Sequence, residues 1–344
     1  MIEKKQKSFY LFWISLALGL IILLILFLTA DWRTILSKLL LLTAFEFVII
    51  FSIRFSIFLI GVWQWSRVLR SYHYHVSLAD LLISSLAERC VTFFTPILYV
   101  GGEGVKAYTI KKIAKVPMKE GLASVIVQRV IEFGTIFLFL LLSGIYLIIQ
   151  NSPISWLVAV LLGAFILFLL FVILLYAGFI NLSIFFKKKK NMGKINKIFT
   201  KIIEFKDVVI QFFKTNRGVF LNNSLFALLT IFLYLIQFKL IFYFLGYQVS
   251  WTGIIAIYII TTIVGFIPIP GALGTYEGSA ILIFSALGLT SSLALTFTLI
   301  NRATFLIIIS FGLLTLFQFT FTRMNQLIFN NHDSLINGET KETN

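Results

Sequence analysis

Residues 266–280 of the chain read FIPIPGALGTYEGSA, and they interrupt strongly apolar sequence on both sides. Pro268, Pro270, Gly271 and Gly274 stand close together here, and Glu277 follows them. Proline removes a backbone donor and glycine permits a tight turn, so a helix must break at this point. Hydrocarbon cannot satisfy the released backbone groups, so such a break survives only where protein or a water-filled cavity covers it. A glutamate at the break is therefore a candidate functional residue.

A similar break is predicted earlier, within the sequence FFTPILYVGGEGVKAY. Pro96 precedes Glu103 by seven residues, which is also the separation of Pro270 from Glu277. Glycines lie between in both stretches, and in the earlier one these are Gly101 and Gly102.

An arginine follows each break inside a long apolar segment. Arg129 lies 26 residues after Glu103, and Arg302 lies 25 residues after Glu277. Two breaks with the same order of residues predict an internal repeat.

The composition is that of an integral membrane protein. Of 344 residues, 59% are hydrophobic and 12% are charged, and the mean hydropathy is +0.99. The single cysteine, Cys90, excludes an internal disulfide. A net charge of +15 would suit nucleic-acid binding in a soluble protein. Its distribution here favours the anionic membrane face instead, and we expect no nucleic-acid partner.

The basic residues also predict the topology. Of 29 Lys and Arg residues, 22 fall on one side of the expected membrane spans, two on the other and five within spans. The positive-inside rule makes the first side cytoplasmic, with both termini on it, in the cell membrane. The expected spans are residues 8–30, 39–62, 118–150, 154–180, 218–245 and 292–322, with a short outer loop at 31–38 and a disordered polar tail at 323–344.

Two further apolar segments are predicted to be re-entrant hairpins. If residues 79–98 crossed the membrane, every later basic loop would face outside, so they are expected to enter from inside and turn near 96–102. Residues 251–267 and 277–289 form the other hairpin, because about 13 residues span roughly 20 Å of a 30 Å core. The predicted fold is all-α: about six full transmembrane helices and two broken hairpins within one domain, 1–322. The first half (8–150) and the second half (154–322) form an inverted repeat, which is typical of transporters.

The segment 181–217 is expected to lie on the inner membrane surface. Apolar and basic residues alternate in it at helical spacing, as in an interfacial amphipathic helix. It opens with a run of four basic residues that are expected to bind anionic inner-leaflet lipids: Lys187, Lys188, Lys189 and Lys190.

These motifs together resemble the transmembrane flippase-like domain of lysylphosphatidylglycerol synthases and its stand-alone relatives. The first element is the Pro96 to Gly101-Gly102-Glu103 stretch followed by Gln128-Arg129, and the second is Pro270-Gly271, Gly274 and Glu277 before Arg302. Relatives often carry an acid three residues after the first arginine, here Glu132. They commonly have Arg where this chain has Lys106. No soluble acyltransferase domain is expected after residue 322, so the resemblance does not imply aminoacylation of lipid.

Glu103, Arg129, Glu277 and Arg302 are the first candidates for a substrate path. Arginine presents a planar fork to phosphate, and a glutamate could accept an ammonium group or a proton. The alternative is that they form two structural Glu–Arg pairs that hold the broken helices. Five further charged residues could support the path or satisfy one another: Glu46, Arg54, Glu88, Arg89 and Glu132. We expect no metal and no cofactor.

The sequence thus favours movement of a phospholipid or polyprenyl-linked lipid, or of its headgroup, between leaflets. Two alternatives stay open. One is a membrane-embedded transferase that modifies a lipid, although no catalytic constellation is legible. The other is a non-catalytic partner of a lipid or glycan synthase, which would tolerate neutral residues at the central charges. The oligomeric state is open.

Overall fold

The computed structural model describes residues 2–95, 101–150, 156, 159–160, 163, 166, 211–267 and 269–339, with side chains from Trp13 to Phe317 in these ranges. Its regular elements there are all helical. In chain order they are α1 (Ile2–Leu28), α2 (Trp32–Leu41), α3 (Ala44–Ser71), α4 (Leu78–Phe94), α5 (Glu103–Ala114), α6 (Met118–Ile149), α10 (Arg217–Phe244), α11 (Trp251–Val264), the 3-10 turn η1 (Pro270–Ala272), α12 (Thr275–Ala286) and α13 (Ser291–Glu339).

Four helices are long and apolar enough to cross a membrane. They are α3, α6, α10 and the part of α13 at Ser291–Phe317. The pair Trp13–Leu28 and Trp32–Leu41, bent by 88°, makes a fifth if it is counted as one span. Most of the expected span at 154–180 and most of the basic segment 181–217, with Lys187 to Lys190, lie outside the described residues. The chain is therefore a multi-pass helical membrane protein, and the expected total of six spans stays a prediction.

The start of the second predicted span was wrong. Residues 31–38 were expected to form a loop, but helix α2 occupies most of them and α3 begins only at Ala44. Asp31 caps α2 by accepting a hydrogen bond from Thr34 N, 3.2 Å away. Hydrogen bonds from Thr34 hold the pKa of the exposed Asp31 carboxyl below its usual range. A capping box between Thr43 and Glu46 then starts α3, and it was legible in the sequence.

The boundary of the last helix also differs from the prediction. Helix α13 continues to Glu339, beyond the expected end at residue 322 and through a tail expected to be disordered. No proline interrupts residues 291–339, and helix propagation is cooperative once begun, so polarity alone did not end this helix.

Both predicted hairpins are present as pairs of short helices that pack against each other: α4 with α5, and α11 with α12. In the first pair, a β-carbon on Gly102 would lie against Thr92 Oγ1. Lys106 also bonds Glu88, so α5 runs back along α4. In the second pair, a β-carbon on Gly253 near the start of α11 would lie 3.5 Å from Leu287 at the end of α12, so this hairpin returns to the end at which it began. Helix α11 has 14 residues, or about 21 Å, which is too short to cross a 30 Å core. Pro96 and Pro268 lie outside the described residues.

The break expected in residues 266–280 is present, and it is tightly enclosed. Gly271 and Gly274 have φ values of +60° and +74°, which side chains rarely tolerate. A β-carbon on Gly274 would lie 2.7 Å from the carbonyl oxygen of Gly19, so α1 packs directly on the break. A β-carbon on Gly271 would lie 3.0 Å from the ring of Phe93 in α4. The first hairpin and the N-terminal helix thus both cover the second break.

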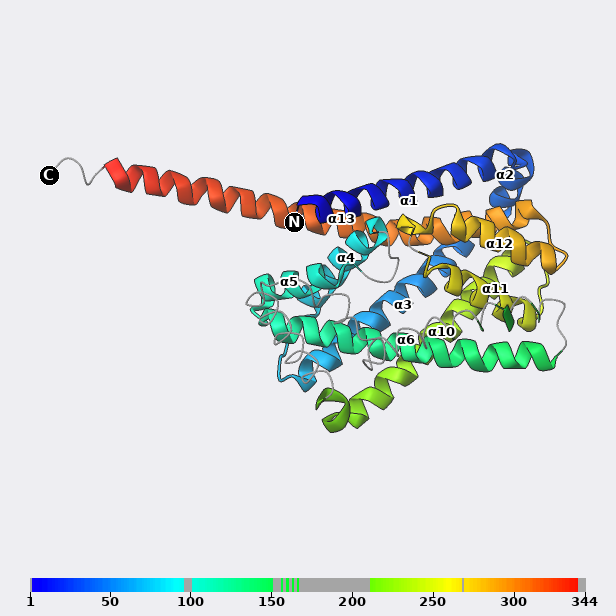
Figure 1. The fold of residues 1–344 in the computed structure, drawn as a ribbon, viewed down its shortest axis with the longest axis horizontal. Helices are drawn as coiled ribbons and strands as arrows, with labels where there is room; N and C mark the ends of the chain where they lie inside the picture. The colour runs from blue at the N-terminus through cyan, green and yellow to red at the C-terminus, as the bar shows by residue number, and fades with distance from the viewer. Residues whose placement is uncertain are drawn as a thin grey trace.

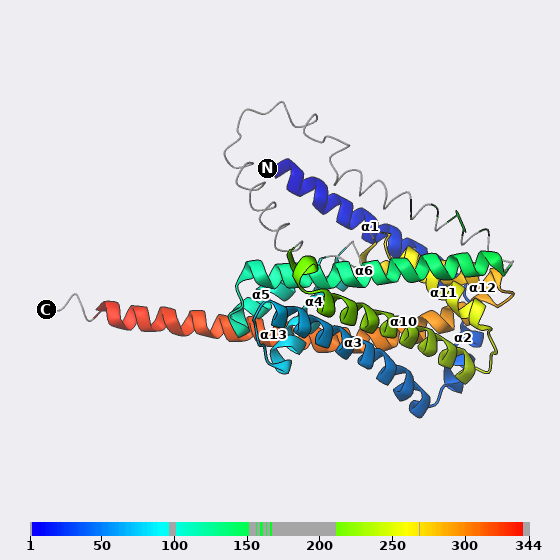
Figure 2. The ribbon, with the colours of Figure 1, turned by 90° about the horizontal axis from the view of Figure 1, so that it is seen from below.

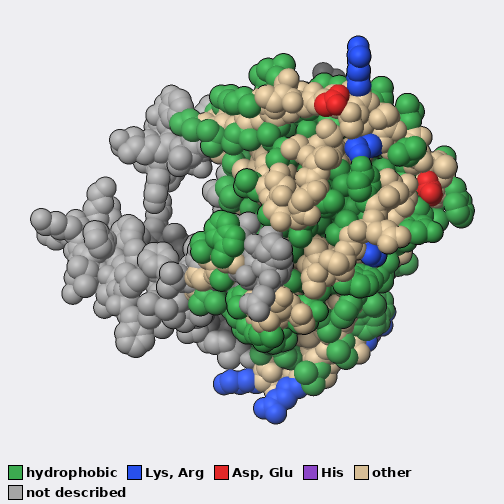
Figure 3. All heavy atoms as spheres, turned by 90° about the vertical axis from the view of Figure 1, so that its right-hand side faces the viewer, with side chains coloured by type: hydrophobic (Ala, Val, Ile, Leu, Met, Phe, Trp, Pro, Cys, Tyr) green, Lys and Arg blue, Asp and Glu red, His purple; other side chains and the backbone are tan. Residues whose placement is uncertain are grey.

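Helices of the two halves interleave: α10 packs against α3 and α6, and α13 packs against α4 (Figures 1 and 2). Gln64 of α3 donates to the carbonyl oxygen of Asn223 in α10 at 2.7 Å, and Asn223 returns a bond to Gln64 at 3.1 Å. At the end that carries α2, Lys38 bonds Tyr247. Charged side chains are sparse over this end, which is mostly hydrophobic (Figure 3). The C-terminal part of α13 extends from the opposite end (Figure 1).

Candidate functional site: a charged cavity between the two halves

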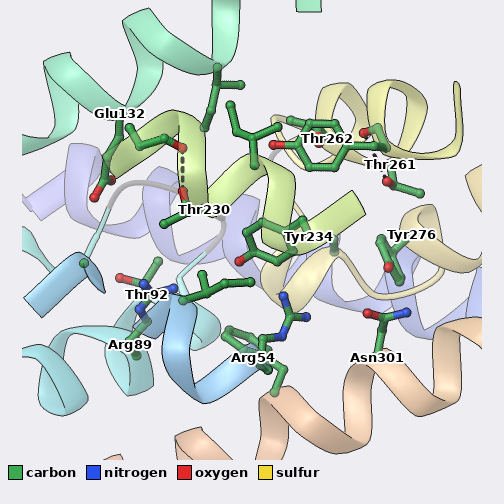
Figure 4. A pocket seen from close by; sticks show the side chains of 18 of the residues that line it. Arg54, Arg89, Thr92, Glu132, Thr230, Tyr234, Thr261, Thr262, Tyr276 and Asn301 are labelled. Carbon is green, nitrogen blue, oxygen red and sulfur yellow. Dashed lines mark hydrogen bonds between the residues drawn. The ribbon is translucent and has the colours of Figure 1, made fainter. Parts of the chain in front are cut away.

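A cavity of about 260 Å³ lies between the two halves. It is lined by helices of both halves (Figure 4). The first half contributes α3, α4 and α6, and the second contributes α10, α11, η1, α12 and α13. Its charged lining residues are Arg54, Arg89, Arg129, Glu132 and Arg302. Charges in the interior of a membrane protein are costly to retain, so this cavity is the candidate functional site.

The first cluster of charges is centred on Arg129 of α6. Its Nε lies 3.3 Å from Glu103 Oε1, its Nη1 lies 2.9 Å from Glu132 Oε2, and its Nη2 contacts Glu88 Oε1. Arg129 and Glu132 are one helical turn apart, as the sequence predicted. Each of its three guanidinium nitrogens thus bonds a different carboxylate.

Lys106 of α5 completes this cluster. Its Nζ lies 2.8 Å from Glu88 Oε2 and 3.1 Å from Gln128 Oε1. Lys106 and Glu88 are only 3% and 2% exposed, so each charge depends on its partners. Gln128 in turn donates to the Gly61 carbonyl oxygen at 3.0 Å and to Glu132 at 2.8 Å. The network joins α3, α4, α5 and α6.

The second cluster consists of Arg302 in α13 and Glu277 in α12. Arg302 Nε contacts Glu277 Oε1, and its Nη2 lies 3.0 Å from Glu277 Oε2. The same guanidinium donates to the carbonyl oxygens of Gly271 at 3.0 Å and Ala272 at 3.1 Å. Arg302 therefore satisfies backbone acceptors that the helix break leaves without intrahelical donors.

The two clusters share a local arrangement. Glu103 accepts a hydrogen bond from Gly101 N at 2.6 Å, and Glu277 accepts one from Gly274 N at 2.9 Å. Each glutamate thus accepts from the amide of a glycine at its break and also pairs with the arginine of the next long helix, and Glu277 in addition caps α12. A negative side chain in the first turn is favourable because the helix dipole is positive there.

Two arginines of the cavity lie outside these clusters. Arg54 of α3 lies over the ring of Tyr234, 5.0 Å from its centroid, and 5.7 Å from that of Phe305. Arg89 of α4 lies 5.8 Å from the ring centroid of Phe58. Among the described residues, neither side chain has a hydrogen-bond or ion-pair partner. Figure 4 shows Arg54 beside Tyr234, with Arg89 near Thr92 on one side and Asn301 on the other.

The structure brings together most of the residues that the sequence singled out. The exception is Glu46, which is partly exposed at the start of α3 and is occupied in its capping box. Lys106 was noted as a basic residue where relatives commonly carry Arg, and not as the partner of Glu88, which lies on another helix. Tyr234, Tyr276 and Asn301 also line the cavity, and no spacing in the sequence distinguishes these tyrosines from packing residues.

The fold and the site together define a multi-pass helical membrane protein with a charged internal cavity beside two broken hairpins. Residues 12–312 match the family described as the lysylphosphatidylglycerol synthase TM region, and the chain belongs to this family. It is 27% identical over 272 residues to a UPF0104 membrane protein of Methanocaldococcus jannaschii, covering 75% of this chain and 80% of the relative. A UPF0104 membrane protein of Methanothermobacter thermautotrophicus is 26% identical over 266 residues, 73% and 78% of the two chains. No solved structure matches the chain.

Proposed function

We propose that this protein moves an amphipathic lipid, or the headgroup of a lipid-linked compound, between the leaflets of the cell membrane. The observation that carries the proposal is the charged cavity built jointly by both halves, with a broken helix on either side. Broken helices beside a central polar site are the architecture of transporters that alternate access by rocking one repeat against the other. The substrate on this reading is a phospholipid or a polyprenyl-linked lipid.

An inverted repeat is the arrangement that we infer for the two halves. The shared pattern of glycine, capping glutamate and arginine supports it, since it occurs once at each break. The hairpins also lie toward different ends of the molecule: α4 and α5 toward the end from which α13 extends, and α11 and α12 toward the end that carries α2 (Figure 1). Hairpins that open toward opposite membrane faces are what an inverted repeat requires.

Leaflet exchange in reconstituted vesicles tests the function. We expect vesicles that contain the protein to equilibrate a labelled lipid between leaflets faster than protein-free vesicles of the same composition. The panel should include anionic, aminoacylated and polyprenyl-linked lipids, because each has a polar headgroup that must cross the hydrocarbon core. No acceleration for any lipid, with protein that is folded by its melting curve, would count against transport and favour a scaffold or a transferase.

Labelling of single cysteines tests the proposed orientation, in which the N-terminus, residues 101–119, residues 181–217 and the C-terminus are cytoplasmic. The argument is the 22-to-2 distribution of basic residues. In a Cys90→Ser background, cysteines at 112 and 190 should react with a membrane-impermeant reagent only after the membrane is opened. The same experiment probes the basic segment proposed to hold anionic inner-leaflet lipids. Reaction at either position in intact cells would overturn the orientation.

A further inference from the structure

We propose that Arg54 and Arg89 are the residues of this cavity that bind substrate, and that they select a lipid with an acidic phosphate headgroup over a cationic aminoacylated one. The proposal rests on the proposed function for the identity of its occupant as a lipid. It assigns Arg129 and Arg302, the stronger candidates from sequence, to positioning the broken helices.

The contacts of Arg129 and Arg302 leave them little capacity for a ligand. Arg129 bonds three carboxylates, and Arg302 bonds one carboxylate and two backbone carbonyl oxygens. The contacts given occupy three of the five N–H donors of Arg129 and four of those of Arg302. The charge of each guanidinium is already matched by at least one carboxylate, so a phosphate would gain less there than at an arginine without a carboxylate partner.

Arg54 and Arg89, in contrast, have no hydrogen-bond or ion-pair partner among the described residues. The Nε of Arg54 is buried and makes no hydrogen bond within the described residues. Tyr234 and Phe305 contact its guanidinium by cation–π interaction, which leaves its N–H donors without an acceptor among the described residues. Arg89 lines the same cavity from α4, next to Thr92 (Figure 4). Two arginines presented from two helices of one cavity are suited to the several oxygens of one phosphate.

The balance of charge points to the same class of ligand. Within the described residues, five cations and four carboxylates line the cavity or belong to its two clusters: Arg54, Arg89, Lys106, Arg129 and Arg302, against Glu88, Glu103, Glu132 and Glu277. Every one of these carboxylates is paired with an arginine or lysine, whereas two of the cations are not. An acidic headgroup would neutralise the surplus, and an added ammonium group would meet unpaired guanidinium groups.

The size of the cavity limits what enters it. About 260 Å³ is below the usual range of sites that enclose a whole drug-sized ligand, which begins near 300 Å³. The space therefore suits a compact headgroup whose acyl or prenyl chains stay in the surrounding hydrocarbon. Large apolar side chains exposed on the helices offer such chains a compatible surface, as at Phe232 and Ile236 of α10.

Direct binding to the purified full chain in detergent tests the assignment without requiring transport. The probes are phosphatidylglycerol, phosphatidylcholine, lysylphosphatidylglycerol and soluble glycerol phosphate, with dissociation constants measured by native mass spectrometry. We expect phosphatidylglycerol to bind most tightly. Arg54→Gln and Arg89→Gln should each weaken it roughly tenfold, the loss expected for one hydrogen bond to a charged group. Arg54→Lys keeps the charge without the fork and should fall between, and it serves if Arg54→Gln does not fold.

Arg70→Gln is the matched control, because Arg70 is an exposed arginine on the same helix as Arg54 and lies outside the cavity. It should bind lipid as the unmodified protein does. Unchanged binding in the Arg54 and Arg89 variants would overturn the assignment, as would tighter binding of lysylphosphatidylglycerol than of phosphatidylglycerol. Glycerol phosphate that binds as tightly as the lipid would make the occupant a soluble phosphate. Failure of leaflet exchange with arginine-dependent binding intact would reject the transport function and keep the binding site.

Discussion

Arg302→Gln is expected to destabilise the whole protein, not merely to slow transport. Glu277 is 2% exposed and would lose its ion-pair partner, while the carbonyl oxygens of Gly271 and Ala272 would lose their donors. Removing one partner of a buried pair costs about 3–5 kcal/mol because it leaves the other charge uncompensated. The measurement is the melting temperature of the purified protein in detergent, with Arg70→Gln as the control that removes an exposed arginine.

A double-mutant cycle separates the pair from the cap. Glu277→Gln can still accept from Gly274 N and leaves no buried carboxylate, so it should cost less than Arg302→Gln. Adding Glu277→Gln to Arg302→Gln should recover part of the lost stability, since the unpaired charge is gone. If Arg302→Gln melts like the unmodified protein but no longer moves lipid, then this arginine acts on the substrate and our assignment of a positioning role is wrong.

Glu88→Gln is expected to have the second large effect. Its carboxylate bonds both Lys106, at 2.8 Å, and Arg129. Within the described residues Lys106 forms a salt bridge with no other carboxylate. The variant would leave a buried ammonium group, at a cost of about 3–5 kcal/mol. Glu132→Gln should cost less, because that side chain is 21% exposed and Arg129 retains two other carboxylates. Thermal unfolding of the two variants under identical conditions measures the difference.

Adding Lys106→Met to Glu88→Gln tests whether the unpaired ammonium group causes the loss of stability. In the Glu88→Gln/Lys106→Met double variant no buried charge lacks a partner, because Arg129 keeps Glu103 and Glu132. It should be more stable than Glu88→Gln alone. A double variant that is less stable than either single variant would mean that packing of Lys106 against Trp65, 4.4 Å from the ring centroid, matters more than its charge.

Local sequence chemistry was enough to predict the helix breaks. Proline and glycine restrict the backbone wherever they occur, so the end of α11 and the start of α12 follow from residues 266–280 alone. The boundary between α2 and α3 was missed because hydrophobicity continues across it, and the decisive signal was the short capping box at Thr43. The extension of α13 was missed because polarity was treated as an end signal, although nothing in that stretch stops a helix.

The members of the site and its two Glu–Arg pairs, Glu103 with Arg129 and Glu277 with Arg302, were predictable from the sequence, but its other contacts were not. Intramembrane charge marked Glu88, Arg89 and Arg129 as unusual. Glu88 and Arg89 are adjacent in sequence, yet successive residues on a helix point in different directions, so one joins the cluster and the other faces the cavity. Which arginine stays available depends on contacts between helices distant in sequence. The spacing of residues along the chain does not predict those contacts.

The close contact of Gly19 with Gly274 has a consequence for the order of assembly. The N-terminal helix is synthesised first, and the break that it covers is among the last segments to be made. Until they meet, the backbone groups around Gly271 and Gly274 lack part of their protein cover, which is unfavourable in hydrocarbon. Helix α1 must therefore stay accessible in the membrane until the second hairpin has been made. A chain that lacks α1, or one that ends before α12, would lack one partner of the contact between Gly19 and Gly274. We expect such a chain to be degraded by quality-control proteases.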